Sequence, residues 1–199
     1  MSFSTYADLK SQIADYLARN DLTSNIPDFI TLFEAVAVRR LRVRPMETST
    51  NLTPSSGSVA LPSDYLSWRR VTWTGSNRVD LEYVHPSILQ AYYPTSPSDT
   101  PAMFTIEGST LKVRPVDATA LEFDYLAKTG ALSSALQWLY TNHFDLYLSG
   151  SLAEAYRFCK NYDQAPVWEQ KRDQIFSEIT LANFREQGHL VIRPMAYTP

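Results

Sequence analysis

The stretch FEAVAVRRLRVRPMETST, residues 33–50, marks the place where the character of the sequence changes. Its first part continues an apolar helical repeat, and Pro45 ends that helix because proline lacks an amide N–H and clashes with the preceding turn. From residue 48 onward, short runs rich in Thr, Val, Tyr and Trp lie between clusters of Pro, Gly, Ser and Asn, as is typical of strands and turns. Between the two patterns lie four arginines, Arg39, Arg40, Arg42 and Arg44.

Two amphipathic helices are predicted before this change. In residues 5–19 apolar side chains recur at helical spacing, and Thr5 followed three residues later by Asp8 predicts a capping box. The second helix has Pro27 in its first turn, where a missing N–H leaves no hydrogen bond unmade. Its expected buried stripe consists of Ile30, Phe33, Ala37 and Leu41.

Residues 48–126 predict a small antiparallel sandwich or barrel. Three hairpins are expected: TSTNLT with SVAL across PSSG, WRRVTWT with VDLEYV across GSN, and AMFTIEG with STLKVRP across Gly108 and Ser109. ALEFDYLA supplies a further strand, and HPSILQAYY is expected to form a short helix. The Pro- and Ser-containing run PTSPSDTP is predicted to be a loop.

The helical period returns after a loop at residues 128–135. Asn142 with Asp145 predicts the cap of a third helix, and Asp163 with Pro166 opens a fourth, for which Gly188 is suited as the residue just past the C-terminus. The third helix has the expected stripe Phe144, Leu148, Leu152, Ala155 and Cys159. The stripe of the fourth consists of Trp168, Ile175, Ile179 and Ala182, with Phe176 beside it.

These patterns predict an α+β fold. An antiparallel four-helix bundle is expected from both ends of the chain, with a small antiparallel β-domain inserted in it and an extended C-terminal tail. The expected boundaries are residues 1–47 and 135–188 for the two halves of the bundle, 48–134 for the insertion and 189–199 for the tail.

Composition narrows the function classes. The 199 residues carry 18 Lys and Arg against 21 Asp and Glu, a net charge of −3, whereas dedicated nucleic-acid binders show a basic excess. Cys159 is the single cysteine, so no intrachain disulfide is possible and a reducing compartment is expected. No signal-peptide pattern and no apolar run long enough to span a membrane is visible, which predicts a soluble protein made in a cytoplasm.

Catalytic patterns are weak. There is no P-loop, dinucleotide fingerprint or metal-ligand spacing among the histidines, and the SGS at residues 149–151 lacks the frame of a nucleophile elbow. His143 and Asp145, two apart on a helix, face different directions, whereas Glu122 and Asp124 share one strand face that is expected to be solvated. The sequence predicts a protein that is not an enzyme and has no cofactor or metal. Convergence of distant catalytic groups stays open.

The arginine run is the first interface candidate. Cations at a helix C-terminus suit the helix dipole, which is the simplest interpretation of any single one. The run contains no lysine, and guanidinium groups favour fixed bidentate contacts, so an acidic protein surface is at least as good a partner as phosphate. At least one arginine is expected to pair with an acid such as Glu34 or Glu47 of its own chain.

Two further interface candidates follow. Trp68, Arg69, Arg70 and Trp73 suit either stacking on single-stranded nucleic acid or packing in a core or subunit contact, and the acidic balance favours packing. The C-terminal stretch HLVIRPMAYTP is too apolar for a free tail, so it either packs on its own helices or docks on another chain, and docking is favoured. Its candidate contacts are Leu190, Val191, Ile192, Arg193, Met195 and Tyr197.

Four stretches in this order carry a family resemblance: TYADLKSQIADYLAR, IPDFITLFEAVAVRRLRVRPMET, VALPSDYLSWRRVTW and LYLSGSLAEAYRF. Together they resemble the head-to-tail adaptor (connector) proteins of tailed double-stranded DNA bacteriophages, over nearly the whole chain. The resemblance implies four-helix bundles with a β-insert that assemble as a dodecameric ring beneath the portal. Such a ring extends the DNA channel and provides the docking surface for the tail or nozzle.

The resemblance also implies partners. Arg39, Arg40, Arg42 and Arg44 would lie at subunit or portal contacts, residues 190–197 would dock on the portal protein, and the β-insert would contact neighbouring subunits or the tail or nozzle protein. The genome would pass without sequence-specific binding, and the protein would be a virion component at the head-to-tail junction, synthesised in the host cytoplasm, with no membrane contact. The alternatives are a DNA-binding module that uses the arginine run and, less favoured, a tail-associated cell-wall hydrolase.

Overall fold

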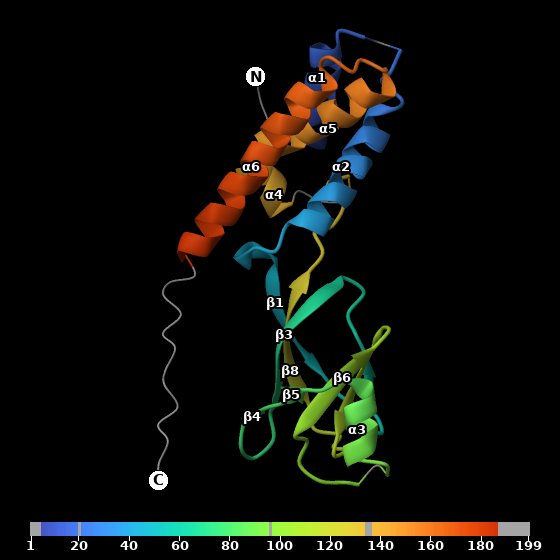
Figure 1. The fold of residues 1–199 in the computed structure, drawn as a ribbon, viewed down its shortest axis with the longest axis vertical. Helices are drawn as coiled ribbons and strands as arrows, with labels where there is room; N and C mark the ends of the chain where they lie inside the picture. Colours follow the sequence, from blue (N-terminus) through green and yellow to red (C-terminus); the bar gives the residue numbers. More distant parts are fainter. Residues whose placement is uncertain (1–4, 20, 96, 134–136, 187–199) are drawn as a thin grey trace. The chain divides into compact units, whose positions relative to one another are not determined.

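The computed structural model describes residues 5–19, 21–95, 97–133 and 137–186. Within these ranges the chain forms six α-helices and two four-stranded sheets, which confirms the α+β class. The chain divides into two compact units (Figure 1). The helical unit is Met1–Pro45 with Thr129–Pro199, and the β unit is Met46–Lys128.

The helical unit contains α1 (Tyr6–Leu17), α2 (Ile26–Arg40), α4 (Trp138–Asn142), α5 (Phe144–Phe158) and α6 (Ala165–Glu186). The predicted capping box of α1 is present, since Asp8 N donates to Thr5 Oγ1 at 3.1 Å and Thr5 N donates to Asp8 Oδ2 at 3.0 Å. Pro27 lies in the first turn of α2, as predicted. The helix ends earlier than Pro45, because Leu41 is already extended.

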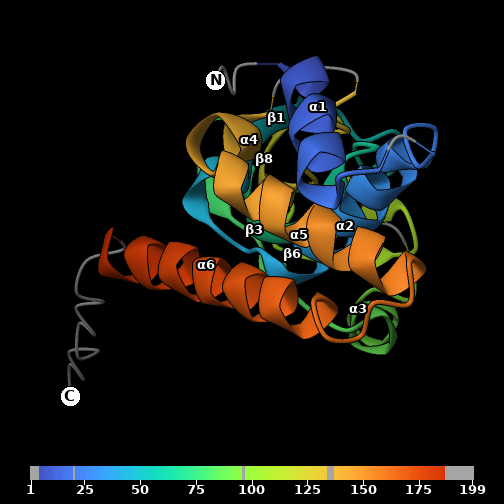
Figure 2. The same ribbon diagram turned by 90° about the horizontal axis from the view of Figure 1, so that it is seen from above.

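Helix α5 is the centre of the helical unit. It contacts α1, α2, α4 and α6, and Figure 2 shows it between α1 and α6. Because neighbours cover it on several sides, its buried surface is much wider than the predicted stripe, of which Phe144 is partly exposed and Cys159 only half-buried. Its buried residues are Leu146, Tyr147, Leu148, Ser149, Gly150, Ser151, Leu152, Ala153 and Ala155.

Helices α2 and α5 approach closely at Gly150. A Cβ atom on this residue would lie 1.9 Å from Cδ2 of Phe33, whose side chain is completely buried. The Phe33 ring also packs edge-on against Tyr147, with ring centroids 5.0 Å apart. The glycine of the SGS stretch therefore allows the close packing of α2 against α5.

Some predicted helix details are wrong. Helix α4 was not expected, and Asn142 does not cap α5, because its side chain donates to Trp138 O within α4 at 3.0 Å. His143 is the N-cap residue of α5 instead. On α6, Ile175, Phe176 and Ile179 are buried as predicted, whereas Ala182 is exposed. Gly188 lies outside the described residues.

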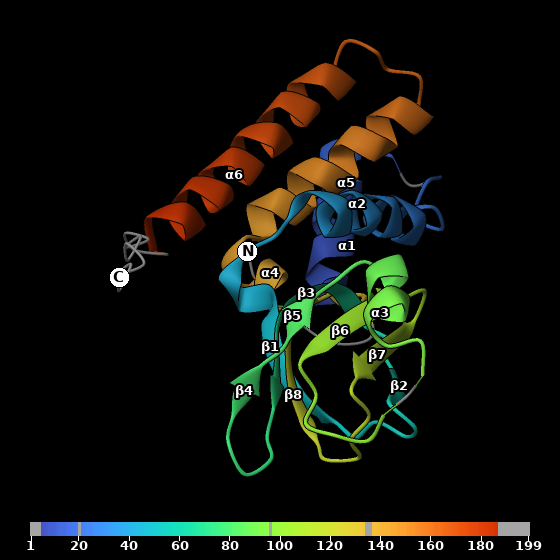
Figure 3. The same ribbon diagram turned by 60° about the horizontal axis from the view of Figure 1, so that its bottom comes forward.

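The β unit holds two sheets, with strand orders β1-β8-β3-β4 and β2-β7-β6-β5 (Figure 3). All pairs are antiparallel except the parallel pair β5 and β6, and α3 (Pro86–Tyr92) lies beside β6. The strands of the first sheet are β1 (Glu47–Leu52), β3 (Tyr65–Trp73), β4 (Val79–Asp80) and β8 (Leu121–Ala127). Those of the second are β2 (Ser58–Ala60), β5 (Glu82–Tyr83), β6 (Met103–Glu107) and β7 (Thr110–Arg114).

The three predicted hairpins have different outcomes. The hairpin of β6 and β7 is confirmed, and β3 pairs with β4 as expected. The run VDLEYV is divided, however, because the buried Leu81 separates β4 from β5, which belongs to the other sheet. The prediction of a hairpin across PSSG is wrong, since β1 pairs with β8 and β2 pairs with β7. The turn there carries the chain from one sheet to the other.

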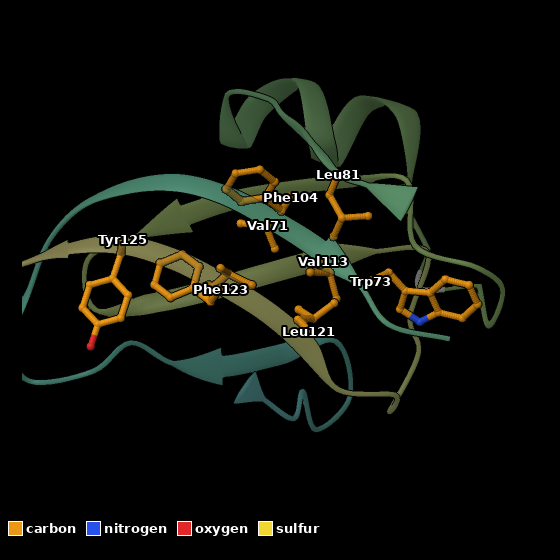
Figure 4. Close-up of a cluster of buried hydrophobic side chains, with 9 residues drawn as sticks. Val71, Trp73, Leu81, Phe104, Val113, Leu121, Phe123 and Tyr125 are labelled. Carbon is orange, nitrogen blue, oxygen red and sulfur yellow. The ribbon is translucent and has the colours of Figure 1, made fainter. Parts of the chain in front are cut away.

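The core of the β unit lies between its two sheets (Figure 4). Both sheets and the segment that joins β4 to β5 contribute large apolar side chains, so this unit has a hydrophobic core of its own. The members are Val71, Trp73, Leu81, Phe104, Leu111, Val113, Leu121, Phe123 and Tyr125.

Glu34 of α2 forms a hydrogen bond with the segment that follows the β unit in the chain. Its Oε1 accepts a hydrogen bond from Leu132 N at 2.7 Å and another from the Tyr147 hydroxyl at 3.4 Å. Leu132 itself is buried in the helical unit. Burial raises the pKa of Glu34, although the hydrogen bonds from Leu132 and Tyr147 act in the opposite direction.

Replacing Gly150 by alanine is expected to destabilise the protein strongly. In an unconstrained helix this change stabilises by about 1 kcal/mol, but here the new methyl group overlaps the Phe33 ring, and overpacking costs roughly 1–3 kcal/mol. Ser151→Ala is the matched control, because the buried Ser151 Oγ has no hydrogen-bond partner and its removal should be neutral or stabilising. Urea unfolding of both variants tests this, and a stable Gly150→Ala variant would contradict the close approach.

Glu34→Gln is expected to change how stability depends on pH. Because the folded pKa lies above that of the unfolded chain, the contribution of Glu34 to stability is greatest below the unfolded pKa and falls as pH rises through the folded pKa. The amide keeps an acceptor for Leu132 N without the charge, so Glu34→Gln should match or exceed the wild type at pH 7 and lose that advantage in acid. Unfolding curves from pH 3 to 8 measure the effect.

The control for this experiment is Glu34→Ala. It leaves Leu132 N without its acceptor and should destabilise at every pH. A Glu34→Gln variant that is less stable than the wild type at pH 7 and more stable at pH 3 would contradict the assignment.

Candidate functional site

The four arginines do not share one helix face. Arg39 and Arg40 lie in the last turn of α2, whereas Arg42 and Arg44 follow in the segment after it. Leu41 and Val43 between them are buried, at 1% and 2% exposure. Alternation of this kind is expected of extended chain and turns the arginines toward solvent. The predicted helical run to Pro45 is corrected accordingly.

Arg40 is held by contacts within its own chain. It forms an ion pair with Asp173 of α6, and its guanidinium lies over the Phe176 ring at 4.6 Å from the ring centroid. Asp173 also accepts from Arg172 Nε at 3.0 Å. Burial raises the pKa of Asp173, but the hydrogen bonds from Arg172 and Arg40 outweigh this effect and hold the pKa below its usual value.

Arg42 serves the end of its own helix. Its Nη1 donates to Val38 O at 2.8 Å and to Leu41 O at 2.5 Å. The last carbonyl groups of a helix have no intrahelical donor, so this side chain satisfies acceptors that would otherwise need water. Arg42 thus has a structural role at the C-terminus of α2.

Arg39 and Arg44 are different. Both are exposed, and within the described part of the chain neither guanidinium makes a hydrogen bond or ion pair, although the backbone N of Arg44 donates to Asn183 Oδ1 at 2.9 Å. Arg40 and Asp173 confirm that at least one arginine of the run pairs with an acid of its own chain, although the two acids named from the sequence have other partners. Glu34 binds Leu132 and Tyr147, and Glu47 lies 3.5 Å from Arg69.

The structure places an apolar surface beside the arginines that sequence reasoning missed. On α6, Leu181 is 57% exposed and Phe184 is 72% exposed. An open groove of about 410 Å³ is lined by Arg40, Phe176, Ser177, Thr180 and Leu181. The sequence signal was the pair of large apolar residues three apart, which falls outside the stripe used to predict the buried side of α6.

The candidates in the β unit divide between surface and core. Trp68 is 38% exposed and stacks on Tyr83, with ring centroids 5.4 Å apart, whereas Trp73 is buried in the core. Arg69 pairs with Glu47, and Arg70 pairs with acids of β8. An interface role for these four residues remains a prediction, and the side chain of Trp73 faces the core rather than a partner.

The face of β8 that carries Glu122 and Asp124 is charge-compensated. Arg70 lies 2.9 Å from Asp124 and 3.8 Å from Glu122, and Arg78 also pairs with Glu122. Carboxylates held in this way form an ionic ladder across neighbouring strands rather than a facing pair of acid and base.

The polar side chains of Asp145 and Cys159 form hydrogen bonds within the helical unit. His143 and Asp145 lie at the start of α5, where Asp145 Oδ1 accepts from Leu146 N at 2.9 Å. The Cys159 Sγ accepts from Arg19 Nη1 at 3.6 Å. Within the described ranges, no group of three His, Cys, Asp or Glu side chains is placed to hold a metal ion, and no helix is long and apolar enough to cross a membrane.

The six C-terminal candidates lie outside the described residues: Leu190, Val191, Ile192, Arg193, Met195 and Tyr197. The site that the structure does describe is therefore the end of α2 with the C-terminal half of α6.

Comparison with known protein families decides the identity. The sequence profile described as SU10 adaptor protein matches residues 4–195, nearly the whole chain. The chain belongs to the SU10 adaptor protein family. This membership confirms the resemblance to bacteriophage head-to-tail adaptors and makes this SU10-family adaptor a structural phage protein. No curated protein sequence matches it.

Arg40→Ala is expected to destabilise the SU10-family adaptor by about 1 kcal/mol, because it removes a half-exposed ion pair and a cation–π contact. Arg39→Ala, the neighbouring control, should change stability by less than about 0.5 kcal/mol, as is usual for an exposed side chain without partners. Urea unfolding measures both. A double-mutant cycle with Asp173→Ala should show coupling, and additive losses would contradict the assigned pair.

Proposed function

We propose that this protein is a head-to-tail adaptor that forms a ring beneath the portal. The single observation that supports this most strongly is the family match over residues 4–195. In this proposal the ring is dodecameric, extends the DNA channel and provides the surface on which the tail or nozzle protein docks. The protein is then a virion component at the head-to-tail junction, made in the host cytoplasm.

The fold fits such a role. Helices α1, α2 and α6 all contact α5, consistent with the four-helix bundle expected of these adaptors, and the β unit has a separate core. A ring of identical subunits uses head-to-tail contacts, which need two different surfaces on each subunit. Exposed apolar and aromatic side chains are available in both units, on α6 and at Trp68 with Tyr83.

The contacts to the portal are proposed to come from two segments. One is the arginine run, in which Arg39 and Arg44 have guanidinium groups free of partners among the described residues. The other is the apolar C-terminal stretch at residues 189–199. Arg69 and Trp68 are the proposed contacts of the β unit with neighbouring subunits or with the tail side.

Genomic DNA is proposed to pass the ring without sequence-specific binding. The chain has a net charge of −3, and phosphate binding requires neutralising cations. Arg40 and Arg42 already have partners within the subunit, which leaves few cations in the run for a DNA-binding module. No described observation favours that alternative or the cell-wall hydrolase.

The test is the native mass of the protein alone and after mixing with its cognate portal. The adaptor should join the portal ring at one copy per portal subunit. A protein that ignores the portal would contradict the proposal. Low-salt binding to double-stranded DNA, lost when all four arginines are replaced by alanine, would point to the DNA-binding alternative.

A further inference from the structure

The C-terminal half of α6 leaves one side uncovered next to the arginines. This side, the α6 flank, consists of Ser177, Thr180, Leu181 and Phe184. At helical spacing these residues share one side of α6, roughly opposite to the buried Ile175 and Ile179. The segment that follows α2 meets α6 at this point, because Arg44 N donates to Asn183 Oδ1, one residue before Phe184.

The groove in the flank is lined by both polar and apolar side chains, and its hydroxyl groups have partners within α6. The Ser177 hydroxyl donates to Asp173 O at 2.9 Å, and the Thr180 hydroxyl donates to Phe176 O at 2.8 Å. Both hydroxyl donors are used within α6, so Leu181 and the Phe176 ring supply apolar surface between the polar groups of the groove. The charge of Arg40 at its wall is balanced by Asp173. The groove therefore suits an apolar side chain.

Two exposed arginines lie near this surface in the chain. The Arg44 backbone is bonded to Asn183 of α6, and Arg39 lies in the same last turn of α2 as the groove residue Arg40. Neither guanidinium has a partner in the described ranges. Arginine beside exposed aromatic and aliphatic anchors is the composition of interface hot spots. A complementary partner has acidic residues on both sides of an apolar anchor.

We infer that the α6 flank with Arg39 and Arg44 is a docking surface for an acidic segment of the portal, whose apolar side chain fills the groove. This rests on the proposed function and names the chemistry of the portal segment. The stretch 187–199 of the chain itself does not fit, because it contains Arg193 and no Asp or Glu. DNA does not fit either, because Leu181 and Phe184 offer apolar area that phosphates do not match.

A photo-crosslinking amino acid at position 184 tests the occupant directly. The full-length protein carrying it is mixed with the purified cognate portal, irradiated and analysed by peptide mass spectrometry. The expected crosslink joins position 184 to a portal segment with Asp or Glu within a few residues of an apolar side chain. A crosslink to a second adaptor copy, to DNA or to a portal segment without acids would overturn the inference.

Paired substitutions test the energetics. Leu181→Ser with Phe184→Ser, and separately Arg39→Glu with Arg44→Glu, should each weaken portal affinity roughly tenfold or more. Only the wild type and the serine variant should retain an affinity for the portal that decreases as the salt concentration rises. The matched controls are Val167→Ser, exposed on the same helix, and Lys160→Glu, exposed in the same unit, and both should change affinity less than about twofold.

The outcomes distinguish a failure of the proposed adaptor function from a failure of the docking surface alone. Circular dichroism and the melting temperature of each variant should match those of the wild type, since all replaced side chains are exposed. If the wild-type adaptor does not join the portal at all, the proposed function fails, and the inference fails with it. If the wild type joins while both paired variants bind unchanged, the docking surface is wrong and the adaptor function stands.

Discussion

The contact between Phe33 and Gly150 sets the distance between α2 and α5, and that distance fixes the rest of the helical unit. The Phe33 ring occupies the space that the Cβ atom of any residue other than glycine would need at position 150. The same ring contacts Tyr147 on α5, and its centroid lies 6.3 Å from the centroid of the Phe176 ring on α6. Phe176 in turn lies beneath the guanidinium of Arg40. A continuous set of packed rings thus joins the centre of the helical unit to the arginine run.

This arrangement explains why four similar residues have different roles. Arg40 is fixed by the aromatic contact and by Asp173, and Arg42 is fixed by the carbonyl groups at the end of α2. Ordering these two side chains within the folded chain reduces the entropy that a later contact would lose. Arg39 and Arg44 have no such restraint from a partner among the described residues. The run therefore combines a rigid base with two guanidinium groups that can adapt to a neighbour.

Sequence patterns predicted some local features correctly. Thr5 and Asp8 form their capping box and Gly108 lies at its turn, because each depends on residues a few positions apart. Long-range pairing was not accessible. Arg40 pairs with Asp173, 133 positions away, where nearby Glu34 and Glu47 were expected. The strands around PSSG likewise join different sheets, since a turn signal gives the reversal of the chain but not the partner strand.

The exposed surface of α6 also depends on packing between residues far apart in the sequence. A helical stripe predicts which side of α6 is buried, but Leu181 and Phe184 are visible as an uncovered pair only once the other helices are in place. On the proposed function, a ring through which DNA passes has to bind proteins firmly and phosphate weakly. Apolar anchors with a small number of arginines meet both needs, because buried apolar area contributes to protein contacts at any salt concentration, whereas each added cation strengthens phosphate binding. On the proposed function, the internal pairing of Arg40 with Asp173 therefore favours selectivity for protein as much as stability.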